Sequence, residues 1–135
     1  MPESRRPPIL LVEDDESFSS VLARQLRAKG YDVEVASSAE EAAALLRTGL
    51  RPALVVLDIN LPGDTGWDLL RLPVMKDAGS PLVIVASAIT VSPRRLAEFS
   101  VAGYLPKPFP IETLLDTVAR LVSGYSTAGA SHPHE

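Results

Sequence analysis

The chain has 135 residues, a length that suits a single domain. It contains no cysteine, which excludes a disulfide framework and thiolate metal sites. Its net charge of -4 argues against nucleic-acid binding by this chain, because neutralising phosphates requires clustered Lys and Arg. No apolar run approaches the roughly 20 residues that span a bilayer. We therefore expect a cytoplasmic protein with neither a nucleic-acid nor a membrane partner.

Five short apolar runs predict β-strands. They cover residues 9–12, 31–36, 53–57, 82–86 and, more weakly, 104–105. Three of the runs are nearly continuous in Val, Ile and Leu, a pattern typical of strands buried on both faces of a parallel sheet.

Helical patterns lie between these runs. Phe18, Val21, Leu22 and Leu26 have the spacing of one apolar helix face. Ser38 and Glu41 have the spacing of a capping box at the start of the next helix. Further helices are predicted at 67–72, where Pro73 should end the helix, at 93–101, and after Pro110 at 111–122.

Strand and helix alternate five times, which predicts an α/β fold with a parallel sheet between two helix layers. We expect a flavodoxin-like (βα)5 three-layer sandwich with strand order 2-1-3-4-5. The predicted domain is 9–123, after a flexible leader at 1–8. Residues 124–135 are small and polar and predict a disordered tail, in which His132 and His134 are solvated rather than metal-binding.

Acidic residues follow two of the predicted strands. Asp15 and Glu16 are explained by the positive N-terminus of the following helix, whereas Asp58 precedes no obvious helix start. In the expected order the first and third strands are neighbours, so Glu13, Asp14 and Asp58 converge at one sheet edge. Two carboxylates about 4 Å apart repel by about 4 kcal/mol at an effective dielectric constant near 20. Three therefore require a proton or a cation, and hard oxygen ligands favour Mg²⁺, or Mn²⁺.

Two further polar residues end the last two strands. Ser87 alone reads as a loop hydroxyl that bonds its own backbone, and Lys107 alone as a solvated surface lysine. Their common place beside an acidic cluster favours a phosphate site instead, where Lys supplies a mobile charge and Ser a short donor.

These residues, in this order, resemble the receiver domains of bacterial two-component response regulators. The resemblance covers about residues 8 to 123. The matching stretches are ILLVEDD at 9–15, LVVLDINLPGDTGWDLL at 54–70, VIVASA at 83–88 and GYLPKPF at 103–109. Each stretch is weak alone, but the four together at this spacing are specific.

The resemblance implies a role for each site residue. Asp58 is the expected phosphoacceptor, and Asp14 the direct metal ligand, with Glu13 acting mainly through metal-bound water. The backbone carbonyl of Asn60 is the third expected metal contact. Ser87 and Lys107 should bind the phosphoryl group, and Ser87 with Tyr104 should form the switch. The Lys107–Pro108 bond is expected to be cis, and Gly66 to mark the turn into the third helix.

The implied partners are a histidine kinase or phosphotransfer protein and an unknown downstream protein. The chain is not expected to be an enzyme beyond its own phosphorylation and dephosphorylation. Asn60 is placed to position the hydrolytic water and Ile89 to shield it, so we expect slow to moderate decay of the phosphoryl group. The span from Ser87 to Lys107 is slightly short, so the fourth helix is expected to be shortened or irregular.

Three alternatives remain open. A phosphorylation-independent pseudo-receiver would act only as a protein-interaction module, and the complete set of site residues argues against it. A phosphatase of the haloacid dehalogenase type requires a second acid at the position of Asn60. A flavodoxin-like cofactor binder requires a Ser/Thr/Gly-rich loop after the first strand, where this chain has acids.

Overall fold

In the computed structural model, residues 7–61, 65–76 and 79–130 are described, and the side chains through residue 123. Five parallel strands form one sheet in the order β2-β1-β3-β4-β5, as expected. The strands are β1 (Pro8–Val12), β2 (Asp32–Ala36), β3 (Leu54–Asp58), β4 (Leu82–Ser87) and β5 (Gly103–Pro106). The helices are α1 (Glu16–Ala28), α2 (Ala39–Arg47), α3 (Gly66–Leu70), the 3₁₀ turn η2 (Pro73–Met75), α4 (Pro93–Glu98) and α5 (Ile111–Ala130).

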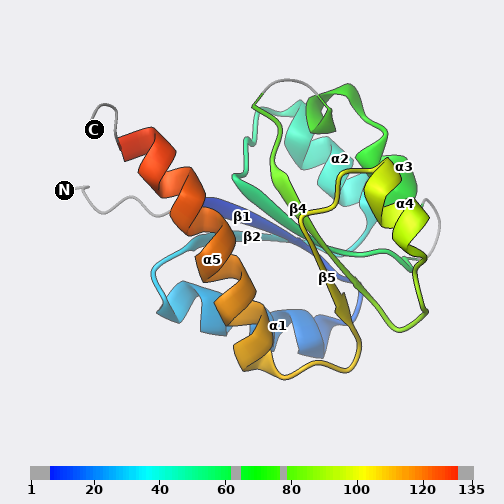
Figure 1. Ribbon diagram of the computed structural model, residues 1–135, viewed down its shortest axis with the longest axis horizontal. Helices are drawn as coiled ribbons and strands as arrows, with labels where there is room; N and C mark the ends of the chain where they lie inside the picture. The colour runs from blue at the N-terminus through cyan, green and yellow to red at the C-terminus, as the bar shows by residue number, and fades with distance from the viewer. Residues whose placement is uncertain (1–6, 62–64, 77–78, 131–135) are drawn as a thin grey trace.

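The helices cover both faces of the sheet, with α1 and α5 on one side and α2, α3 and α4 on the other (Figure 1). Alternate residues of each central strand enter opposite core layers. In β1, Leu10 and Val12 pack with α2 and α3, whereas Ile9 and Leu11 pack with α1 and α5. This two-sided burial explains why the strands are continuous in aliphatic residues.

The apolar face of α1 differs in part from the prediction. Leu22 and Leu26 are buried as expected, and Ala23 joins them. Val21 is 43% exposed and does not belong to the core. The buried face therefore lies about one residue further round the helix than the spacing of the large side chains indicated.

Only one of the two hydrogen bonds of the predicted capping box forms at the N-terminus of α2. The Ser38 hydroxyl accepts a hydrogen bond from the Glu41 N–H. The Glu41 carboxylate accepts from the N–H and the hydroxyl of Ser37, not from Ser38, at 2.7 Å each. These bonds hold the pKa of Glu41 below its ordinary value. A reciprocal capping box occurs at α3 instead, between Thr65 and Asp68.

The ends of the predicted domain also differ. Pro8 belongs to β1 rather than to the leader. Helix α5 continues to Ala130, so residues 124–130 are helical where we expected a disordered tail. Residues 131–135, with His132 and His134, and residues 1–6 lie outside the described part of the chain. Within that part, no helix has the length and apolar character needed to cross a membrane.

Two irregular helices agree with the prediction. Helix α3 ends at Leu70, and Pro73 begins the separate turn η2. Helix α4 has only six residues, and none of them is buried. Helix α4 is therefore held to the domain by half-buried side chains alone. Its shortness agrees with the prediction made from the short span between Ser87 and Lys107.

Gly66 starts α3 against the end of β3, where a side chain has no room. A Cβ atom would lie 2.7 Å from Ile59 Cδ1 and 3.0 Å from Ile59 Cα. The Ile59 Cα atom belongs to the backbone and cannot rotate away from the added methyl group. Gly66→Ala should therefore lower the free energy of unfolding by about 2 kcal/mol, although alanine forms helices more readily than glycine. Urea unfolding measures this. Gly103→Ala is the control, because its closest contact is a side-chain methyl at 3.3 Å. Equal losses in both variants would contradict the prediction.

Candidate functional site

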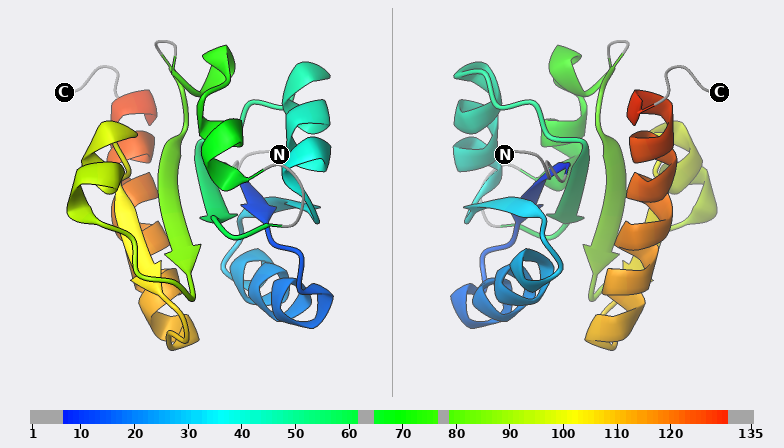
Figure 2. Two further views of the ribbon diagram at one scale, coloured as in Figure 1. Left: turned by 90° about the vertical axis from the view of Figure 1, so that its right-hand side faces the viewer. Right: turned by 90° about the vertical axis from the view of Figure 1, so that its left-hand side faces the viewer.

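The parallel register brings the polar residues to one edge of the sheet. Val12 pairs with Leu57, Asp58 with Ala86 and Ser87 with Pro106. Glu13 is therefore level with Asp58, while Ser87 lies one residue and Lys107 two residues beyond that level, so that all four lie at the carboxyl edge of the sheet. In Figure 2 the arrowheads of β3 and β4 point to this carboxyl edge.

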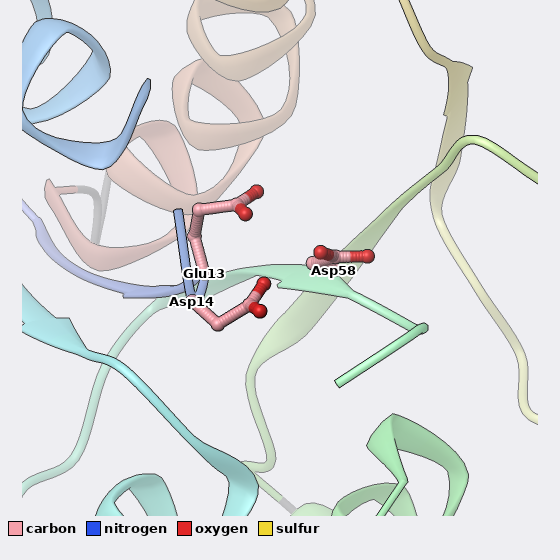
Figure 3. Close-up of side chains that lie close together, drawn as sticks. All are labelled: Glu13, Asp14 and Asp58. Carbon is pink, nitrogen blue, oxygen red and sulfur yellow. The ribbon is translucent and has the colours of Figure 1, made fainter. Parts of the chain in front are cut away.

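Three carboxylates meet at this edge. Glu13 and Asp14 follow β1, and their carboxylates point toward Asp58 at the end of β3 (Figure 3). One oxygen from each of the three lies within 4.8 Å of the others. Glu13 and Asp58 are only 3% and 6% exposed, whereas Asp14 is exposed. The expected convergence of these acids is therefore present in the structure.

Lys107 is the cation of this cluster. Its Nζ lies 2.8 Å from Glu13 Oε1 and 3.3 Å from Asp58 Oδ2. The same ammonium group lies 5.0 Å from the centre of the Phe18 ring, a cation–π contact that helps to hold it. The Phe18 ring is in turn packed edge-on against Phe109. With three carboxylates and one ammonium, the ionised cluster carries a net charge of -2.

The surroundings shift the pKa values of two of these groups. Burial raises the pKa of Glu13, and the charge of Asp58 adds to this effect, against the opposing hydrogen bonds from Lys107 and the Asp15 N–H. Burial lowers the pKa of Lys107, but the hydrogen bond to Glu13 and the charge of Asp58 together raise it above its ordinary value. Lys107 is therefore firmly protonated at neutral pH.

Backbone donors fix the remaining carboxylate oxygens. Asp58 Oδ1 accepts the N–H of Asn60 at 3.0 Å. Glu13 Oε2 accepts the N–H of Asp15 at 3.1 Å. The Asp15 side chain itself caps α1 by accepting from the Phe18 N–H. This agrees with the prediction that Asp15 serves the N-terminus of the following helix and not the acidic site.

Ser87 is fully buried, and its hydroxyl faces the loop that follows β4. It donates to the Ile89 carbonyl at 2.7 Å and accepts from the Ile89 N–H at 3.0 Å. It also accepts a hydrogen bond from the Asn60 side-chain amide at 3.0 Å. The serine hydroxyl is thus bound to its own loop, as the simpler interpretation of the sequence had it, while lying beside Asp58.

Tyr104 joins β5 to the same loop. Its hydroxyl accepts a hydrogen bond from the Val91 N–H at 3.3 Å. The side chain is half-buried beside the core of the α2–α3 face. The Lys107–Pro108 peptide bond is cis, the isomer that the resemblance implied.

The donor set of the cluster fits a divalent cation. Three carboxylates converge, and one of them, Asp14, is open to solvent. Such oxygen ligands, with water completing the shell, are those that Mg²⁺ prefers. The net charge of -2 is the one that such an ion neutralises.

The family model of the response regulator receiver domain matches residues 9–119, most of the chain. The chain belongs to this family of receiver domains. Receivers are signalling modules of two-component systems. The acidic cluster and Lys107 lie at the carboxyl ends of the strands, the edge at which parallel α/β sheets bind ligands.

Curated relatives and solved structures agree with this. The DNA-binding response regulator MtrA of Mycobacterium tuberculosis is 37% identical over 88% of the chain and 52% of its own length. The response regulator MprA of Mycolicibacterium vanbaalenii is 34% identical over 84% of the chain and 49% of its own length. The chain thus spans about half the length of the curated relatives it matches.

Two solved receivers show the same fold. The non-phosphorylated HemR receiver domain from Leptospira biflexa has a TM-score of 0.78 and 34% identity, over 96% of this chain and 100% of that one. The response regulator TrrA from Thermotoga maritima, solved in complex with Mg²⁺–BeF, has a TM-score of 0.73 and 27% identity, over 85% of this chain and 98% of that one.

Two features beside the site were not predicted from the sequence. One is the side-chain bond from Asn60 to Ser87, which joins the ends of β3 and β4. The other is a group of stacked rings and guanidinium groups between α3 and α4, formed by Trp67, Arg71, Arg95 and Phe99. Neighbouring strand ends hint at the first, but no spacing in the sequence indicates the second.

Proposed function

We propose that this receiver accepts a phosphoryl group on Asp58, from the phosphohistidine of a histidine kinase or a phosphotransfer protein. The main support is the setting of Asp58. Its carboxylate is nearly buried, lies within 4.8 Å of Glu13 and Asp14, and contacts Lys107 and the Asn60 N–H. A purely structural aspartate does not require two further acids and a lysine around it.

The chemistry follows from these contacts. An Asp58 carboxylate oxygen attacks phosphorus in line, a P–O bond forms, and the P–N bond to the donor imidazole breaks with its electron pair going to nitrogen. Lys107, already 3.3 Å from Asp58 Oδ2, offsets the charge on the phosphoryl oxygens. The Asn60 N–H holds the other oxygen and so orients the carboxylate.

Asp14, Asp58, the Asn60 backbone carbonyl and, through water, Glu13 would hold Mg²⁺ or Mn²⁺. A bound ion of this kind supplies further charge neutralisation at the phosphoryl oxygens. The expected metal requirement rests on the three converging acids and on their net charge with Lys107.

Phosphorylation would switch the loop after β4. The Ser87 hydroxyl must leave the Ile89 carbonyl to donate to a phosphoryl oxygen, and Asn60 must then release it. The bond from Val91 to Tyr104 carries this change to β5. The two packings of this face would differ in affinity for a downstream protein.

The domain would catalyse only its own phosphorylation and dephosphorylation, in the cytoplasm, with Asn60 and Ile89 setting a slow to moderate decay. A phosphoryl half-life of seconds would contradict that decay. The name DNA-binding belongs to the MtrA relatives, whereas this acidic chain is proposed to act through proteins.

The test is the intact mass after incubation with acetyl phosphate. The wild type should gain the mass of one phosphoryl group when Mg²⁺ is present and none when it is chelated. Asp58→Asn should gain nothing in either condition. The control Asp32→Asn removes an exposed carboxylate at the start of β2, far from the carboxyl edge, and should behave as the wild type. No gain in any variant would favour the pseudo-receiver alternative.

A further inference from the structure

A pocket of about 350 Å³ adjoins the phosphoacceptor. Asn60 and Ser87 are among its lining residues, and they are hydrogen-bonded to each other. Ile89, Trp67 and Arg95 also line the pocket. The pocket therefore shares Asn60 with the hydrogen-bond partners of Asp58, although Asp58 itself does not line it.

Arg95 is held at this pocket by aromatic rings. Its guanidinium carbon lies 4.8 Å from the Trp67 ring centre and 5.6 Å from the Phe99 ring centre. The two rings are themselves stacked, with centroids 5.0 Å apart. The side chain is half-buried on these faces, so little conformational entropy is lost when it meets a ligand.

The charge of Arg95 is weakly compensated. Its one ion pair with a described residue, to Glu98, is 3.7 Å long and joins side chains that are 40% and 53% exposed, an arrangement worth little. Among the described residues that line the pocket, Arg95 is the only charged one. A ligand in the pocket therefore meets a positive side chain in its lining, and the acids of the metal cluster are not among the described lining residues.

We propose that Arg95 sets the preference of this receiver among small phosphoryl donors, favouring those whose leaving group is an anion. The proposal rests on the proposed function of Asp58. With an acyl phosphate, the bond between phosphorus and the bridging oxygen breaks, and the oxygen keeps the electron pair and leaves as a carboxylate. With phosphoramidate, the P–N bond breaks and the protonated nitrogen leaves as neutral ammonia. The proposal places the leaving group in the pocket that Arg95 lines, where this cation would stabilise only the first.

The experiment compares the two donors in the full chain. Rates of Asp58 phosphorylation are measured with acetyl phosphate and with phosphoramidate, at saturating Mg²⁺, for the wild type, Arg95→Gln and Arg95→Lys. The ratio of the acetyl phosphate rate to the phosphoramidate rate should fall about fivefold in Arg95→Gln, as for one partly solvated charge interaction. Arg95→Lys keeps the charge and should recover most of the ratio.

The ratio separates this role from a structural one. If Arg95 only holds α4 against α3, Arg95→Gln would change both rates by the same factor, and the unchanged ratio would overturn the proposal. Phosphorylation of the wild type by neither donor would overturn the proposed function, and this inference with it. Phosphorylation by both donors with a constant ratio would overturn this inference alone.

Discussion

Lys107→Met slows the phosphorylation of Asp58 by about 100-fold, the usual effect of removing one positioned charge from a transition state. Without divalent cations, the same change lowers the free energy of unfolding by about 2 kcal/mol. Glu13 is 3% exposed and would lose its partner at 2.8 Å. Breaking a fully buried pair costs about 3–5 kcal/mol, and Lys107 is 20% exposed, so we expect less. Methionine keeps most of the apolar stem of the lysine and removes the ammonium group that lies over Phe18.

Magnesium should restore part of the lost stability of Lys107→Met but not its phosphorylation rate. The variant cluster carries one more negative charge, so Mg²⁺ should bind more tightly to Lys107→Met than to the wild type and should restore part of its stability. The phosphorylation rate should stay low, because the ion does not replace the ammonium group. Thermal unfolding at several Mg²⁺ concentrations and the acetyl phosphate assay measure both, with the exposed Lys29→Met as control. Weaker Mg²⁺ binding by Lys107→Met would contradict the charge argument.

The strand order and the place of the site were predictable because both follow from few residues. Continuous aliphatic runs such as 54–57 cannot lie on a one-sided sheet, and alternation with helices leaves a parallel arrangement. Once β1 and β3 are neighbours, a residue just after each strand must lie at the same edge. The backbone positions of Glu13 and Asp58 are close for this reason, independently of the side-chain conformations.

The pairing of side chains at that edge was not predictable. The sequence predicts that Ser87 and Lys107 bind a phosphoryl group, but it does not indicate their protein partners: the lysine bonds to Glu13 and Asp58, and the serine to Ile89. Each group pairs with a protein group of opposite charge or with a hydrogen-bond partner, because burying a charge or a hydroxyl without such a partner costs free energy. Such choices depend on side-chain rotamers, which spacing along the chain does not encode.

Contacts between helices were missed for a related reason. Trp67 and Phe99 lie 32 positions apart, and nothing in either segment indicates that the rings stack. Similarly, the small polar residues after 123 have low helix preference, yet α5 continues through Ala130. Composition predicted a tail there, whereas the helix begun at Ile111 propagates, since adding a residue to an existing helix costs less than starting one.

Asp14→Asn is expected to reverse its effect on stability when Mg²⁺ is added. Without the ion, the variant should be more stable than the wild type by about 0.5 kcal/mol, because it removes one of three carboxylates that repel one another. The gain is small since Asp14 is exposed and solvent screens its charge. With Mg²⁺ the wild type should become the more stable protein. A ligand at 100 times its dissociation constant adds about 2.7 kcal/mol, and the variant, which lacks a direct ligand, should gain much less.

The reversal distinguishes a metal site from an acidic cluster that merely tolerates its charge. Urea unfolding of the wild type, Asp14→Asn and the control Asp32→Asn, each with Mg²⁺ and with a chelator, measures it. Asp32 is exposed at the start of β2, so its removal should shift stability alike in both conditions. If Asp14→Asn were more stable than the wild type in both, the three carboxylates would not form a magnesium site. Asp14 is exposed, so its replacement leaves the core intact and the comparison concerns charge and metal binding alone.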